Sequence, residues 1–332
     1  MRSEQKMNAG TRAAPAIEIE IEPMDAPLGA EIRCGDVRVL DNDGIAAIRA
    51  AWLEHLVVVF RGQTLSDAEL IAFGRHFGEF QYSNPLPSPL AHEGKALQGG
   101  KDERHPEITV VSNIVENGVA IGGFGDAELV WHTDMSSFEA PPHQTVLYAL
   151  EVPDTGGSTG FANMYAAYDA LPSDLKGQVR GLALKHDATT DAAGYIRSQY
   201  ATTRDMDLRT SPGAIHPLVC THPETGCDYL YLGRRSRAYI QNLALEDSES
   251  LLDTLWAHAT QPVFAWRHQW RVGDLVMWDN RCVLHHREPF DEGARRCLHR
   301  IVIKGSKPLQ CAASYAQQPY RRAASRKSQQ VY

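Results

Sequence analysis

The chain has 332 residues, of which 43% are hydrophobic and 22% charged, a composition typical of folded globular proteins. Its formal net charge of −8 disfavours nucleic acid or an anionic membrane as the main partner. A small anionic substrate is still compatible with this charge, because a few buried arginines can make the electrostatic potential of a binding site positive. No stretch approaches the roughly 20 apolar residues that span a bilayer, and residues 1–14 lack the apolar core of a secretory signal.

The six cysteines form no CxxC pair, and their spacing fits neither a zinc ribbon nor a small disulfide-rich scaffold. We therefore expect reduced thiols and a cytoplasmic setting. Residues 1–14 are expected to be a disordered leader and residues 311–332 a basic, flexible tail. Residues 15–310 are expected to form a single domain.

The first elements alternate between strand and helix patterns. Residues 17–21 alternate apolar and polar side chains, which predicts a strand, and a second short strand is expected at 30–34. Residues 41–54 have the periodicity of a helix, and the apolar, β-branched run at 56–60 is typical of a buried strand.

A capping box then marks the start of a second helix. Ser66 and Glu69 have the spacing of an N-cap and its partner three residues on, and the helix is expected to end at Gly78. Residues 81–108 are rich in proline, glycine, histidine and charge, which predicts a long loop and a candidate lid. A short strand is expected at 108–112.

The middle of the chain combines strands with one interrupted helix. Strands are predicted at 146–150 and 159–162, followed by helical periodicity over 163–181 that Pro172 interrupts. Residues 187–213 are polar and irregular, and they form a second candidate lid.

The last third is mostly strands, around a helix at 247–259. The strands are predicted over residues 215–220, 229–232, 263–267, 275–278 and 298–303. Many short strands with a few interposed helices favour a β-rich α+β fold, a sandwich or jelly roll that carries helices, over a βαβ repeat.

His132 and Asp134 form a His-x-Asp pair after a glycine-rich loop. In an extended segment, residues i and i+2 point to the same side, so an imidazole and a carboxylate can converge on one ion. The pair alone is weak evidence in a chain with 14 histidines and 41 acidic residues.

A further histidine, His285, follows the strand and turn that end in Asp279 and Asn280. A buried strand closed by an Asx turn explains the aspartate and the asparagine, but it does not explain the adjacent His285 and His286. Two histidines and one carboxylate on one face leave coordination positions open, which favours iron(II) and oxygen chemistry over a closed zinc site.

Arg296, Leu298 and Arg300 share one face of the next predicted strand. Because Leu298 is expected to face the core, the two arginines are expected to face inward, where they require an anionic partner. A guanidinium binds a carboxylate through two parallel hydrogen bonds. Thr159 is a further hydroxyl donor for such a carboxylate, although each of these residues is also compatible with an ordinary surface or strand position.

Together these motifs resemble one known family, the taurine dioxygenase/2,4-dichlorophenoxyacetate dioxygenase family of iron(II)/2-oxoglutarate-dependent oxygenases. The resemblance covers about residues 20–306. It rests on the following stretches: Leu28–Ile32, Val59–Gln63, Trp131–Asp134, Gly156–Thr159, Trp278–Arg281 with His285, and Arg296 with Arg300.

The resemblance implies a double-stranded β-helix with helices packed on its major sheet, in a protein that is commonly a dimer or tetramer. It implies that His132, Asp134 and His285 bind iron(II), where O2 reacts. Arg296 and Thr159 would hold the distal carboxylate of 2-oxoglutarate. Arg300 would lie in the same cosubstrate site and bind an anionic group of the primary substrate.

Three departures from the family pattern concern the substrate and the distal ligand. His286 directly follows the expected ligand, so the assignment to His285 rests on its spacing from Trp278–Arg281. Glu128 stands where the taurine enzyme carries an amide, and it either binds a cationic group or faces solvent. Ala188 replaces an aromatic substrate contact, so taurine itself is not the expected substrate.

The function expected from the resemblance is hydroxylation of a small organic acid, such as an aryloxyalkanoate or a sulfonate, with decarboxylation of 2-oxoglutarate to succinate and CO2. Two alternatives are a metal-dependent hydrolase on a jelly-roll scaffold and a non-catalytic jelly-roll module that binds an anion. A hydrolase needs no anchor for 2-oxoglutarate, so it is not expected to bury Arg296 together with Thr159. A non-catalytic module is not expected to retain an open metal site.

Overall fold

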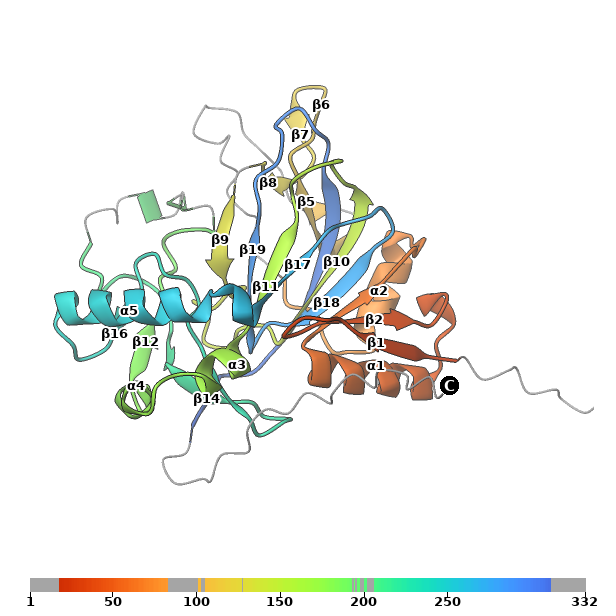
Figure 1. Ribbon diagram of the computed structural model, residues 1–332. Coiled ribbons are helices and arrows are strands. Elements are labelled where there is room, and N and C mark those ends of the chain that lie inside the picture. The colour runs from red at the N-terminus through yellow and green to blue at the C-terminus, as the bar shows by residue number, and fades with distance from the viewer. Residues whose placement is uncertain are drawn as a thin grey trace, which may run out of the picture.

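The computed structural model describes residues 18–82, 101–102, 105–126, 128–192, 194, 196–197, 200–201 and 206–311 (Figure 1). The predictions for residues 1–14 and 312–332 lie outside the described residues, as do those for most of the first candidate lid and part of the second.

The largest element is a nine-stranded mixed sheet, which supplies one wall of the site. All neighbouring pairs are antiparallel except β2 with β3 and β5 with β8. In the order in which they lie side by side, the strands are β1 (Glu20–Pro23), β2 (Ala30–Arg33), β3 (Val57–Phe60), β18 (Leu275–Asp279), β10 (Gln144–Glu151), β20 (Cys297–Ile303), β5 (His105–Ser112) and β4 (Lys101–Asp102), with β8 (Gly123–Phe124) also paired to β5.

The centre of this sheet is buried on both faces, as the strand β3 illustrates. Val57 and Val59 belong to one hydrophobic cluster, whereas Val58 and Phe60 belong to another. Because successive side chains of a strand point to opposite faces, a continuous apolar run fills two cores at once.

Helices α1 (Asn42–His55) and α2 (Asp67–Arg75) cover the outer face of the sheet. Trp52 of α1 and Phe73 of α2 belong to the cluster that also contains Phe60. At the start of α2, the Ser66 hydroxyl accepts from the Glu69 amide at 3.3 Å, and the Glu69 carboxylate accepts from the Ser66 amide at 2.8 Å. The predicted capping box is therefore confirmed.

A four-stranded antiparallel sheet faces the inner side of the large sheet and carries much of the site. Its order is β17 (Ala265–His268), β11 (Thr159–Asn163), β19 (Val283–Arg287) and β9 (Leu129–His132). Phe161 of this sheet and Trp278 of the large sheet meet in the core between them, with ring centroids 5.4 Å apart.

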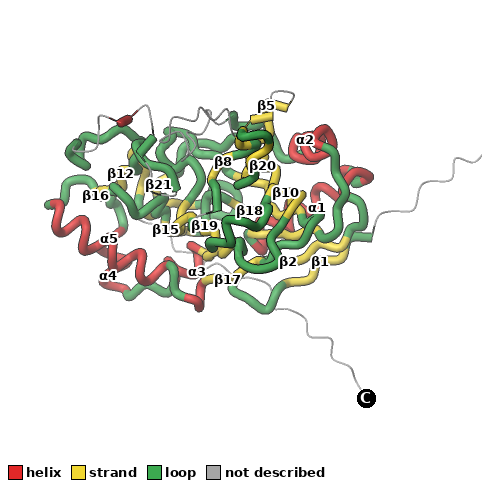
Figure 2. Tube along the Cα trace, turned by 90° about the horizontal axis from the view of Figure 1, so that it is seen from above, coloured by secondary structure: helices red, strands yellow, loops and turns green. Residues whose placement is uncertain are grey.

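The remaining elements surround these two sheets, and Figure 2 shows α3, α4 and α5 on the side away from α1 and α2. The helical segments are η1 (Val37–Val39), α3 (Met164–Asp169), α4 (Ser173–Val179), α5 (Leu245–Ala259) and η4 (Pro262–Phe264). The short strands are β6 (Val115–Glu116), β7 (Val119–Ala120), β12 (Ala183–Lys185), β13 (Ile215–Pro217), β14 (Val219–Thr221), β15 (Asp228–Leu230), β16 (Tyr239–Ile240) and β21 (Leu309–Gln310).

The predicted β-rich fold with helices is confirmed, but several boundaries are wrong. The predicted interruption at Pro172 is confirmed, since Pro172 lies between α3 and α4, but α4 ends at Val179, sooner than expected. The loop expected to reach residue 108 ends sooner, since β5 begins at His105. His285 lies inside a strand of its own, β19, which the sequence pattern did not indicate.

Within the described part of the chain, no helix has the length and apolar character needed to cross a bilayer. All six cysteines are buried thiols.

Replacement of Ser66 by alanine removes the N-cap acceptor of α2. We expect Ser66→Ala to lower the free energy of unfolding by about 1 kcal/mol, the usual cost of losing such a cap. Ser250→Ala, at an exposed position inside α5, is the matched control and should change stability by less than about 0.5 kcal/mol. Chemical denaturation of both variants checks this, and equal stabilities would contradict the role of the cap.

Candidate active site

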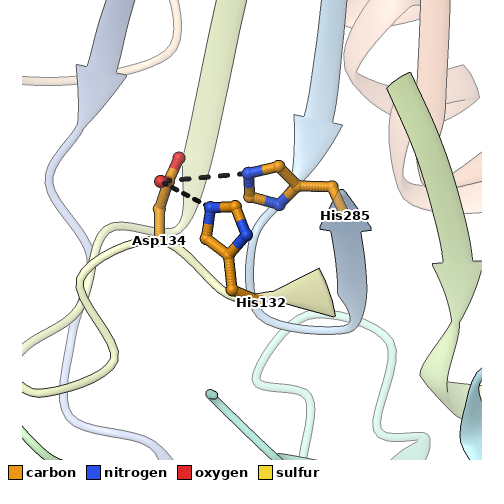
Figure 3. Close-up of side chains that lie close together, drawn as sticks. All are labelled: His132, Asp134 and His285. Carbon is orange, nitrogen blue, oxygen red and sulfur yellow. Dashed lines mark ion pairs between the residues drawn. The ribbon is translucent and has the colours of Figure 1, made fainter. Parts of the chain in front are cut away.

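Two neighbouring strands and the loop after one of them bring together His132, Asp134 and His285 (Figure 3). His132 on β9 pairs directly with His285 on β19. Oδ1 of Asp134 lies 3.9 Å from Nε2 of each histidine, and the potential ligand atoms all lie within 4.8 Å of one another. These separations suit three atoms that surround a single ion.

The two imidazoles are held in orientations that suit a ligand. His132 Nδ1 lies 2.7 Å from the carbonyl oxygen of Val130, so Nδ1 carries the proton and the lone pair of Nε2 faces Asp134. The ring of His285 packs beside Trp278, with centroids 4.8 Å apart. The pair is therefore preorganised by the fold.

Asp134 is held by side chains from the large sheet and from the turn after β18. The hydroxyl of Thr145 donates to Oδ2 at 2.8 Å, and Nη1 of Arg300 donates to Oδ1 at 3.2 Å. The side chain of Asn280 accepts from the Asp134 amide at 2.9 Å and donates to its carbonyl at 3.0 Å. Both the backbone and the carboxylate of Asp134 are thus fixed.

The electrostatics favour the protonation states that bind metals. Burial lowers the pKa of His132 to about 4 and that of His285 well below its ordinary value. Burial alone would raise the pKa of Asp134, but Arg300 and the two imidazoles hold it at about 2. At neutral pH the set is two neutral imidazoles and one carboxylate, which is the form that coordinates a divalent transition metal.

A cavity opens between the two sheets beside these three residues. One part of its wall is apolar and consists of Val111, Phe124, Leu129, Leu147 and Trp278. The rest is polar and consists of His132, Asp134, Thr159, His285, His286, Arg287, Arg296 and Arg300. Apolar walls with a few converging polar groups are typical of a small-molecule site.

Arg296, Arg300 and Thr159 all line this cavity, so the interpretation of the arginines as solvated surface residues is wrong. Arg296 is 2% exposed and its Nε has no hydrogen-bond acceptor among the described residues. Burial, together with the neighbouring Arg287, lowers the pKa of Arg296 to about 9. The Thr159 hydroxyl accepts from Nε1 of Trp270 at 2.9 Å, which leaves its own proton for an anion.

The three departures from the family pattern have clear positions. His286 borders the cavity, but its ring packs against Trp131 at an angle of 42° with centroids 4.1 Å apart, and it is not part of the three-residue cluster. Glu128 is exposed, which favours its solvent-facing alternative. Ala188 is half-buried and does not line the cavity.

Three residues of the site were not identified from the sequence. In the sequence pattern, Thr145 is an ordinary strand threonine. Asn280 was attributed to an Asx turn, but it is the Asp279 side chain that makes this turn, by accepting from the Arg281 amide at 3.0 Å. Arg287 follows His285 by two residues in a strand, a spacing that could have indicated a second inward cation.

A second cluster, His222, Asp279 and Cys282, is a structural network rather than a metal site. Nδ1 of His222 accepts from the backbone amides of Glu224 and Thr225 at 3.2 and 3.1 Å, so Nε2 carries the proton and donates to Asp279. The carboxylate of Asp279 also accepts from Arg281. Burial raises the pKa of the Cys282 thiol well above its ordinary value.

The chain matches known proteins over most of its length. The family model described as "Taurine catabolism dioxygenase TauD, TfdA family" matches residues 20–302. The "Alpha-ketoglutarate-dependent 2,4-dichlorophenoxyacetate dioxygenase" of Cupriavidus pinatubonensis is 35% identical over 86% of this chain and 98% of its own. The "(S)-phenoxypropionate/alpha-ketoglutarate-dioxygenase" of Sphingobium herbicidovorans is 34% identical over 89% of this chain and 98% of its own.

The structure of the chain agrees with this match to the family. A solved structure, AAD-2 in complex with Mn(II) and N-oxalylglycine, superposes with a TM-score of 0.67 at 27% identity and covers 88% of this chain and 99% of its own. The chain therefore belongs to the TauD/TfdA family and is an α-ketoglutarate-dependent dioxygenase.

Thr145→Val tests whether the hydroxyl contact to Asp134 matters for metal binding. The replacement keeps the shape of the side chain but removes the donor, and loss of such a supporting contact usually lowers metal affinity by about 10- to 100-fold. Titration with Mn(II) or Fe(II) under anaerobic conditions measures this affinity. Thr221→Val removes a similar hydroxyl contact, 2.6 Å to Asp228, that lies away from the site. This variant should leave the metal affinity unchanged. Equal affinities in both variants would contradict the role of Thr145.

Proposed function

We propose that His132, Asp134 and His285 bind iron(II), and that the protein uses it with 2-oxoglutarate and O2 to hydroxylate a small organic acid. The single observation that carries this proposal is the convergence of the three side chains in a cavity that the buried Arg296 also lines. Two histidines and one carboxylate with open positions are the ligand set of non-haem iron(II) oxygenases. The Mn(II) in the related AAD-2 structure supports a divalent metal.

Arg296 and Thr159 are proposed to bind the distal carboxylate of 2-oxoglutarate. Arg296 offers two parallel donors from a buried position in the cavity wall, and a buried cation of this kind is stabilised by an anionic partner. The bound N-oxalylglycine of the AAD-2 structure carries carboxylates at both ends, as 2-oxoglutarate does. This anchor leaves the keto-acid end of 2-oxoglutarate free to lie toward His132, Asp134 and His285.

The iron would supply the site at which O2 oxidises 2-oxoglutarate to succinate and CO2 and the substrate becomes hydroxylated. The chain's residues supply the surroundings for that chemistry. Thr145 and Arg300 hold the Asp134 carboxylate, and the Val130 carbonyl fixes the tautomer of His132. Phe124 and Trp278 help to exclude water from the cavity.

The proposed primary substrate is a small anionic compound of the aryloxyalkanoate or sulfonate type. The apolar part of the wall suits a hydrocarbon or aryl body, and Arg300, in the polar part of the same cavity, provides a cation for an acidic group. Two relatives named for 2,4-dichlorophenoxyacetate and phenoxypropionate support this class. Cavity shape and charge therefore favour an organic acid over a neutral or cationic compound.

We also propose the type of fold, the domain bounds, the oligomeric state and the location of the protein. The two facing sheets are proposed to form the double-stranded β-helix, or jelly roll, within one domain at residues 15–310, with a basic tail at 311–332. A dimer or tetramer in the cytoplasm is proposed from the resemblance, and six buried, reduced thiols support the setting. The metal-dependent hydrolase and the binding module are set aside because the chain belongs to a dioxygenase family.

Asp134→Ala removes the carboxylate ligand and is expected to abolish substrate-dependent succinate formation. The chain should remain folded, because the remaining contacts of the segment, including those of Asn280, involve the backbone of Asp134. Succinate release and the circular dichroism spectrum measure the two properties. Asp253→Ala, at an exposed position on α5, is the control that should retain activity. Undiminished succinate formation by Asp134→Ala would refute the ligand assignment.

Arg296→Ala removes the proposed anchor of the cosubstrate. We expect the apparent KM for 2-oxoglutarate to rise by roughly 10- to 100-fold, as for loss of a charge-assisted hydrogen-bond pair, with a much smaller change for the primary substrate. The neighbouring Arg295, which is exposed and pairs with Glu151 at 2.6 Å, provides the control variant Arg295→Ala. An unchanged KM in Arg296→Ala would mean that another residue holds 2-oxoglutarate.

A further inference from the structure

Trp270, in the turn between β17 and β18, donates a hydrogen bond to a residue of the proposed cosubstrate site. Its Nε1 lies 2.9 Å from the Oγ1 atom of Thr159. Thr159 lines the cavity, whereas Trp270 lines a separate groove at the surface together with Trp266 and Arg271. The hydrogen bond therefore connects a residue outside the cavity to one that borders it.

The position of the Trp270 indole is fixed by the turn and by the strand next to it. In the turn, Oδ2 of the buried Asp274 accepts from the amide of Arg271 at 2.8 Å and lies 3.1 Å from Nε2 of His268. The His268 ring packs edge-on against the Trp270 ring, with centroids 4.7 Å apart and an angle of 88° between the planes. Because His268 is paired with Thr159 across β17 and β11, the indole N–H is held beside the Thr159 hydroxyl.

The direction of the Thr159 hydroxyl follows from this contact. An indole N–H is a donor only, so Oγ1 of Thr159 is the acceptor and the single hydroxyl proton points away from Trp270. Thr159 is 3% exposed, and none of the residues that the structure describes accepts this proton. A buried donor without an acceptor is unfavourable, so the hydroxyl is suited to an acceptor on a bound ligand.

The segment that contains Thr159 also packs against Arg296. A Cβ atom added to Gly157 would lie 3.3 Å from Nε of Arg296, and the φ of +63° at Gly157 also favours glycine there. Thr159 and Arg296, the two residues proposed to bind the distal carboxylate, both line the cavity. Trp270 therefore anchors a segment that supplies one of these donors and lies close to the other.

We propose that Trp270 is a positioning residue for 2-oxoglutarate: its N–H holds the Thr159 hydroxyl in the orientation that donates to the distal carboxylate. This inference rests on the proposed function, because it uses the carboxylate site of Arg296 and Thr159. Trp270 acts through Thr159 and does not itself contact the ligand. As a consequence, Trp270 affects the affinity for 2-oxo acids that have a distal carboxylate and not the affinity for those that lack one.

Isothermal titration of the Mn(II)-loaded protein in the absence of O2 tests the role of Trp270 by binding alone. The probes are 2-oxoglutarate and 2-oxopentanoate, which has a methyl group in place of the distal carboxylate. Trp270→Phe keeps an aromatic ring but lacks the N–H, and we expect it to weaken 2-oxoglutarate binding about three- to tenfold, as for loss of one hydrogen bond. The affinity for 2-oxopentanoate should not change. Trp266→Phe removes the indole of another tryptophan in the same groove and should bind both probes as the wild type does.

A double-mutant cycle with Thr159→Val shows whether Trp270 acts through the hydroxyl. Thr159→Val keeps the shape of the side chain and removes the hydroxyl, so it should weaken 2-oxoglutarate binding by at least as much as Trp270→Phe does. In the Thr159→Val background, Trp270→Phe should cause no further loss, because the two changes remove the same interaction. Trp270→Met, which also lacks the donor, takes the place of Trp270→Phe in both measurements if the latter does not fold.

Unchanged 2-oxoglutarate binding by Trp270→Phe would overturn the role of Trp270. An equal loss for both probes, or losses that add in the double variant, would overturn it too, because either result indicates a general disturbance of the site. Failure of the wild type to bind 2-oxoglutarate would instead overturn the proposed function, and this role with it.

Discussion

The structure depends on one arrangement of charge: the Asp134 carboxylate, buried between two sheets, faces two neutral imidazoles and the guanidinium of Arg300. A buried carboxylate is unfavourable unless hydrogen bonds and opposite charge stabilise it. Here Thr145 and Arg300 from the large sheet supply both, and the small sheet supplies the histidines. The two sheets must therefore pack in this register for the site to form.

The same packing gives the cavity two groups of polar side chains, one of potential metal ligands and one of cationic and hydroxyl groups. Neutral histidines and an ionised aspartate form the first group, and Arg296 and Thr159 belong to the second. A molecule with a chelating group at one end and a carboxylate at the other matches these two groups. The family to which the chain belongs uses such a cosubstrate, so family membership and cavity chemistry agree.

Features that depend on residues close together in the chain could be predicted from the sequence, whereas contacts between distant segments could not. The capping box at Ser66, the apolar run of β3 and the His-x-Asp pair depend on residues close in the chain, so their spacing predicts them. The contacts of Thr145 and Asn280 with Asp134 join residues 11 and 146 positions apart. Such contacts depend on sheet order, which residue spacing does not encode, and the strand around His285 was missed for the same reason.

The most direct test of the central claim is an anaerobic spectral titration, first with Fe(II) and then with 2-oxoglutarate. If the three side chains bind the metal and the cosubstrate chelates it, a visible charge-transfer absorption appears only when both are present, and it saturates at one equivalent of each per chain. No absorption, or 2-oxoglutarate binding with equal affinity in the absence of metal, would contradict the shared site.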